Sequence, residues 1–165
     1  MARKSDVEKF NNMSKAERRV AVAKDVIKQI NSGLFTAESY YFYPKRKILE
    51  NVSEADLPKT SCYVCGIGAA AIAKIMKFNN YDFDNRPSSH VFYQGECHNA
   101  LVDCFTEHQL HTIEYWFESN DIFSMPHDWL KKSKENRMLC IYQSIIDNKG
   151  KVLSSTFNDY ETTYE

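Results

Sequence analysis

The chain has 165 residues, of which 43% are hydrophobic and 13% aromatic, and its formal net charge is −1. This length and composition predict one domain with a real hydrophobic core and exclude a disordered chain. No apolar run approaches the roughly 20 residues of a membrane-spanning helix, and the N-terminal MARKSDVEKFNNMSK is too polar for a secretory signal. The cysteine count of five is odd, so we expect a cytoplasmic protein with reduced thiols.

The near-neutral total hides an uneven distribution of charge. Residues 1–60 hold twelve Lys and Arg against eight Asp and Glu, a net charge of +4. Residues 79–130 hold nine acids and one base, Arg86, a net charge of −8. This pattern lacks the basic footprint of direct nucleic-acid binding. It favours either a solvated acidic face or a site for a partner protein with a basic surface. For such a site we single out Asp103, Glu107, Glu114 and Glu118.

The first clear helix is predicted over SKAERRVAVAKDVIKQINSG, residues 14–33. Ser14 and Glu17 have the spacing of a capping box, and Gly33 is typical of a helix end. The helical spacing of the apolar residues predicts a buried stripe of Val20, Ala23, Ile27 and Ile30.

The next segment is rich in tyrosine. Residues 40–43 favour a short strand or hairpin arm that ends at Pro44, and a charged connector then leads to Thr60. Residues 63–78 have a helical pattern, and residues 81–95 a loop with one short strand at most.

Two further helices are predicted in the second half of the chain. Thr106 and Gln109 form another capping box, followed by the apolar stripe Leu110, Ile113 and Phe117. A linker containing Met125–Pro126 leads to SKENRMLCIYQSIIDNKG, which Gly150 ends. Its inward residues are predicted to be Met138, Ile141, Tyr142 and Ile145.

These elements predict a mainly α (α+β) fold, a compact domain of about four helices with a small β-hairpin. The domain is predicted to cover residues 1–157 and a polar tail residues 158–165, and the end SSTFNDYETTYE is expected to be frayed. Nothing in the sequence predicts an oligomeric state.

The stretch TSCYVCGIGAAAIAKIM, residues 60–76, looks most like a chemical site. Cys62 and Cys65 have the spacing of half a zinc site, which needs a second half. That half is either Cys97 with His98, or Cys104 with His108 and His111, although no second C-x-x-C is present.

The same two cysteines allow other chemistries. They have the spacing of a redox pair, but the surrounding β-α-β pattern is missing. Either thiol could also serve as a nucleophile with His90 or His98 as its base. The second alternative function is therefore a cysteine- or zinc-dependent enzyme.

A nucleotide site is a further alternative. Gly66 and Gly68 at a helix start could offer backbone N–H groups to a phosphate. A base could stack on Tyr40, Tyr41 and Tyr43, which would make the protein a sponge for a nucleotide signal.

Close packing explains the stretch without a ligand, and we favour it. Five of the six residues 66–71 are glycine or alanine, so a neighbouring backbone can approach closely. We therefore expect Cys62–Met76 to form a mostly buried helix against residues 14–33 or the Leu110–Phe117 helix, with structural cysteines and no cofactor.

Four segments carry a resemblance: AKDVIKQI, CYVCGIGAA, FTEHQLHTIEYWFE and NRMLCIYQSIIDNKGKV. Together they resemble a family of small uncharacterised proteins of bacteriophages and their hosts, over roughly residues 16–157. The resemblance implies no activity, cofactor or catalytic residue. It implies a phage accessory protein in the bacterial host cytoplasm that binds and inhibits a host protein, with anti-phage defence as one target class.

Overall fold

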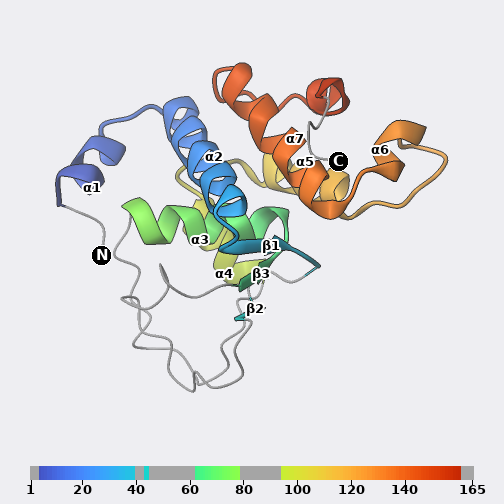
Figure 1. The fold of residues 1–165 in the computed structure, drawn as a ribbon. Helices are drawn as coiled ribbons and strands as arrows, with labels where there is room; N and C mark the ends of the chain where they lie inside the picture. The colour runs from blue at the N-terminus through green and yellow to red at the C-terminus, as the bar shows by residue number, and fades with distance from the viewer. Residues whose placement is uncertain (1–3, 40–42, 45–61, 79–93, 161–165) are drawn as a thin grey trace.

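The computed structural model describes residues 4–39, 43–44, 62–78 and 94–160. Helices make up most of this part of the chain and the strands are short, so the predicted mainly α class is confirmed (Figure 1). The elements in chain order are α1 (Lys4–Asn11), α2 (Lys15–Asn31), β1 (Phe35–Ala37), β2 (Tyr43–Pro44), β3 (Cys62–Val64), α3 (Gly66–Phe78), α4 (Gln94–Leu101), α5 (Glu107–Glu118), α6 (His127–Lys131), α7 (Lys134–Asp147) and the 3₁₀ helix η2 (Ser154–Asp159).

Helix α3 is the centre of the core. It packs against α1, α2, α4 and α5, and almost all of its residues are buried. Its small residues allow this approach: a Cβ atom added at Gly66 would lie 3.2 Å from Ile113 and 3.3 Å from Phe117. The prediction of a buried helix packed against α2 and α5 is therefore confirmed.

The start of that prediction is wrong. Cys62–Val64 form strand β3, and the helix begins only at Gly66. The strand forms because residues distant in sequence satisfy its backbone: the Cys62 N–H donates to the Leu34 carbonyl, and the Glu38 N–H to the Val64 carbonyl, both at 2.9 Å.

Strand β3 is the middle of a three-stranded sheet with the order β1-β3-β2. It runs parallel to β1, with Phe35 opposite Cys62, and antiparallel to β2, with Tyr43 opposite Tyr63. The predicted β element thus belongs to a sheet that also recruits β1. Residues 40–42 and most of the predicted connector lie outside the described residues.

Local sequence signals set the ends of the long helices. The predicted capping boxes at Ser14 and Glu17 and at Thr106 and Gln109 are both present. Gly33 follows α2 with φ +75°, a left-handed conformation that favours glycine.

Helix α7 covers the other side of α2 and packs on α5. Its predicted inward residues are all buried, and the Tyr142 hydroxyl donates a hydrogen bond to the Gly66 carbonyl. Gly150 ends this region with φ +84°, and a Cβ atom there would overlap the Ala16 carbonyl oxygen. The Arg19 Nε donates to the Gly150 carbonyl at 2.5 Å, which ties the end of α7 to α2.

Two segments of the C-terminal half, expected to be a frayed end and a linker, form short helices around buried aromatic residues. Phe157 is fully buried in η2 against α7, so the expectation that Ser154–Asp159 fray is wrong. The expected linker after Met125–Pro126 contains α6, where Trp129 is fully buried and its Nε1 donates to the Trp116 carbonyl at 2.8 Å. In both segments one buried aromatic ring packs the helix against the core. Each helix is too short to show the apolar periodicity from which a helix is predicted.

Candidate partner-binding site

Three of the four singled-out acids lie along α5. Glu107, Glu114 and Glu118 are separated by seven and four residues, which places them on one side of the helix. The buried stripe Leu110, Ile113 and Phe117 lies about a quarter of a turn round the helix from these acids. Glu114 and Glu118 therefore flank the packed side of α5 and are only partly exposed, whereas Glu107 is exposed.

Asp103 belongs to a different environment. It lies between α4 and α5, where one carboxylate oxygen is 2.6 Å from the Lys74 ammonium and the other is 3.4 Å from Arg18. Lys74 is only 4% exposed and also donates to the Ala100 carbonyl at 2.6 Å. Partial burial opposes ionisation of Asp103, but the hydrogen bond and charge of Lys74 outweigh it, and the pKa of Asp103 is lowered. The charge of Asp103 is thus balanced by Lys74 and Arg18 of the same chain.

The acids of α5 differ in exposure. The side chain of Glu107 is 80% exposed, with His111 Nε2 at 3.9 Å. Glu118 accepts a hydrogen bond from Ser39 at 2.9 Å and pairs with Lys134 of α7 at 3.3 Å. Glu114 is partly buried. Of the four, Glu107 is the acid most available to a partner.

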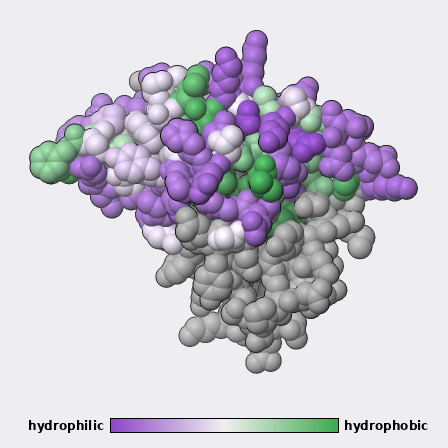
Figure 2. All heavy atoms as spheres, turned by 180° about the vertical axis from the view of Figure 1, so that it is seen from behind, coloured by the Kyte–Doolittle hydropathy of each residue, from purple (hydrophilic) through white to green (hydrophobic). Residues whose placement is uncertain are grey.

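The loop after α5, residues 120–124, is called the tip loop. It exposes two large apolar side chains that the sequence analysis missed: Ile122 is 71% exposed and Phe123 93% exposed. Seen from behind, the described surface is mostly hydrophilic, and a hydrophobic protrusion stands at its left edge, the side on which α6 lies (Figure 2). The signal available in the sequence was an apolar pair between polar residues, NDIFS.

Hydrogen bonds hold the tip loop in shape. The Asp121 carboxylate accepts from the Phe123 N–H at 2.9 Å and from the Ser124 hydroxyl at 2.6 Å, and these bonds lower the pKa of Asp121. The Tyr115 hydroxyl, on α5, lies 2.5 Å from the Ser124 hydroxyl.

The two ends of the tip loop are anchored in the core. Before it, the buried Arg137 guanidinium donates to the carbonyls of Phe117 at 3.2 Å and Ser119 at 2.9 Å. After it, Met125 is buried and its N–H donates to the Asp121 carbonyl at 3.0 Å. The two exposed apolar side chains are therefore presented on a fixed support.

The five cysteines lie among the described residues, are buried, and form no disulfide. Burial raises the pKa of Cys65 to about 12 and that of Cys104 to about 12. A nucleophilic or redox cysteine needs a lowered pKa, so the surroundings of these two thiols give no support to a cysteine-dependent enzyme that uses them. His90 lies outside the described residues.

The predicted zinc ligands lie in two elements and in the residue between β3 and α3. Cys62 is in β3, Cys65 joins β3 to α3, and Cys97 and His98 are in α4. Within residues 4–39, 43–44, 62–78 and 94–160, no group of three or more His, Cys, Asp or Glu is arranged to hold a metal ion. Cys65 and Cys97 instead lie near Tyr142, where burial and then these two thiols raise the pKa of its hydroxyl.

The structure describes only part of the predicted nucleotide site. Gly66 and Gly68 are buried at the start of α3, and Ile113 and Phe117 cover Gly66. A phosphate at this position would have to displace those two side chains. Tyr40 and Tyr41 lie outside the described residues, and Tyr43 is a residue of β2.

Comparison of the chain with protein-family models, with curated proteins and with solved structures found no match. The resemblance to phage proteins therefore stays a prediction. A separate observation concerns membranes: none of the helices described here is long and apolar enough to cross a bilayer.

Proposed function

We propose that this chain is a non-catalytic protein that binds a partner protein through the tip loop and the exposed acids beside it. The partner presents an apolar pocket with a basic rim. In line with the resemblance to phage proteins, the proposed partner is a protein of a bacterial host, and the chain is a phage-type accessory protein that inhibits it. Anti-phage defence proteins are one class of target.

The observation that carries the proposal is the exposure of Phe123 on an ordered loop. Leaving a large aromatic side chain 93% exposed forgoes the free energy of burying it. Aromatic side chains are enriched at the centres of protein interfaces, where they act as anchors. Since hydrogen bonds already hold the loop, binding would cost little additional conformational entropy.

The charges near this anchor set the chemistry of the partner. Asp121 and Asp128 are exposed at the tip loop and at the start of α6. Glu107 is exposed as well, but it begins α5, roughly 16 Å of helix away from the end that leads to the tip loop. The rim charges Asp121 and Asp128 accelerate encounter with a basic surface and select against acidic ones. Asp103 is not part of this rim, because Lys74 and Arg18 already neutralise it.

A pull-down from bacterial host lysate tests the proposal. Phe123→Ala should remove a partner that the wild type retains, whereas Val102→Ala should keep it, because Val102 is also exposed (67%) but lies outside the tip loop. Asp128→Lys should weaken retention and reduce its salt dependence. Glu8→Lys, on the exposed side of α1, is the matched charge control. Retention of the same partners by Phe123→Ala and Asp128→Lys would refute the proposed surface.

A further inference from the structure

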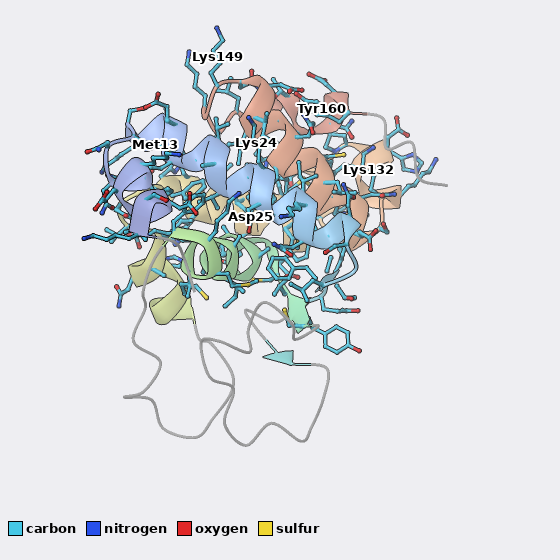
Figure 3. The ribbon with its side chains drawn as sticks, turned by 60° about the vertical axis from the view of Figure 1, so that its left-hand side comes forward. Met13, Lys24, Asp25, Lys132, Lys149 and Tyr160 are labelled. Atoms are coloured by element: carbon cyan, nitrogen blue, oxygen red, sulfur yellow. The ribbon has the colours of Figure 1, made fainter. Side chains whose placement is uncertain are left out.

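A cleft of about 600 Å³ lies where α1 and α2 meet the C-terminal ends of α3 and α7. Figure 3 shows Met13, Lys24 and Lys149 on this face of the molecule. The apolar part of its lining comes from Met13, Val20, Ala21, Phe78 and Ile146. The cleft lies outside the proposed partner-binding surface.

Four lysines converge on this cleft from four different parts of the fold. Lys9 belongs to α1, Lys24 to α2 and Lys77 to α3, and Lys149 follows α7. Lys77 pairs with the buried Asp25 at 3.6 Å. Within the part of the chain that the structure describes, Lys9, Lys24 and Lys149 make no ion pair, so their charges remain available to a ligand.

The acids of the cleft do not cancel this charge. Asp6 and Glu17 line it, and Asp25 is paired with Lys77, so four lysines stand against three carboxylates. The Glu17 carboxylate is held by the capping box, where it accepts a hydrogen bond from the Ser14 N–H at 2.7 Å. The cleft thus keeps a small net positive charge above an apolar floor, a combination suited to an amphipathic anion.

The floor favours an aliphatic ligand over a nucleobase. Its one aromatic residue, Phe78, is 7% exposed, and its ring stacks on Phe10 at 4.5 Å between centroids. Phe10 covers one face of the ring, the Lys77 ammonium lies 5.4 Å from the ring centroid, and the small exposed fraction leaves little of the ring for a base to stack on. Met13, Val20 and Ile146 offer flexible or branched aliphatic side chains instead.

We propose that this cleft binds a small aliphatic anion, with a carboxylate or phosphate headgroup held by Lys9, Lys24 and Lys149 and an alkyl chain along the apolar floor. This inference is independent of the proposed partner binding. Each methylene that the floor covers should tighten binding about fourfold, from the free energy of burying a CH₂ group.

Isothermal titration calorimetry on the full chain tests the inference with defined probes below their micelle concentrations. Octanoate and octyl phosphate distinguish the two headgroups, 1-octanol supplies the chain without charge, and inorganic phosphate supplies charge without the chain. At least one octyl anion should bind 10-fold or more tighter than both 1-octanol and phosphate. Equal affinity of the octyl anions and 1-octanol, or no binding of either anion, would overturn the proposal.

Two variants place the binding in the cleft. Lys24→Gln should weaken binding of the octyl anion about fivefold or more, while Lys28→Gln should leave it unchanged, because Lys28 is an exposed lysine one turn along α2 that does not line the cleft. Ala21→Leu should block the apolar floor without changing charge, and a thermal melt checks that it folds. Equal effects of the Lys24 and Lys28 changes, or full affinity in Ala21→Leu, would refute the site.

Discussion

Replacing Asp103 by Asn tests whether this acid stabilises the fold. The substitution keeps the shape of the side chain but removes the charge that pairs with Lys74 at 2.6 Å. Lys74 is 4% exposed, so its ammonium would stay buried with the Ala100 carbonyl as its remaining partner. Because the Asp103 side chain is 39% exposed, solvent screens part of the loss. We therefore expect a cost of about 1–3 kcal/mol, below that of a fully buried pair.

Urea denaturation at pH 7 measures this cost, with Glu107→Gln as control. Glu107 is an exposed acid, and its substitution should change the free energy of unfolding by less than about 0.5 kcal/mol. The pKa of Asp103 is lowered in the folded state, so its contribution is present above the unfolded pKa of about 4 and is lost as pH falls through the folded pKa. The difference between wild type and Asp103→Asn should accordingly shrink toward pH 3. Equal stability of the two variants at pH 7 would refute the reasoning.

Three further predictions follow from the packing of α3 and the end of α7. Ala70→Leu should lower the free energy of unfolding in urea by about 1–3 kcal/mol, because it overpacks the core. Cys62→Ser should lower it less, and a larger loss for Cys62→Ser than for Ala70→Leu would contradict the packing account. Gly150→Ala should lower stability by at least about 1 kcal/mol because its φ is +84°, and an unchanged melting temperature would be inconsistent with this. With burial raising the pKa of Cys65 to about 12, native protein at pH 8 should label slowly at this thiol, and rapid labelling would reopen the enzyme alternative.

The parts of the fold that sequence reasoning predicted are those with local signals. The capping boxes at Ser14 and Thr106 and the helical spacing of apolar residues gave α2, α5 and α7, and the run of small residues gave the burial of α3. In each case neighbouring residues carry the information, through hydrogen bonds within one turn or through a repeated apolar spacing. The buried stripe predicted for α2 is wrong in two of its four residues, because Val22 and Val26 are buried while Val20 and Ile27 are only partly buried.

The parts of the fold that sequence reasoning missed depend on contacts between residues far apart in the sequence. Strand β3 is three residues long and is held by pairing with β1. The helical pattern of the residues after it therefore led to the prediction of a helix from Cys62. Likewise, the pairing of Asp103 with Lys74 and Arg18 joins residues 29 and 85 positions apart.

The two candidate binding surfaces could not be predicted from the sequence for the same reason: both depend on contacts between residues distant in the chain. The tip loop has no periodicity, and its exposure depends on the anchoring of its ends by Arg137 and Met125. The lysines of the cleft come from four elements that only the tertiary fold brings together. Sequence patterns therefore singled out the acids of α5, but indicated neither the aromatic anchor of the tip loop nor the basic cleft.

The central claim, that the chain binds a partner protein through the tip loop, is tested most directly by photo-crosslinking in host cells. Phe123 is replaced by the photoreactive residue p-benzoylphenylalanine, and in a matched protein the same residue replaces Leu153, an apolar side chain 40% exposed between α7 and η2. The account predicts a discrete crosslinked adduct with a host protein from position 123 and none of that mass from position 153. No adduct at position 123, or the same adduct from both positions, would contradict it.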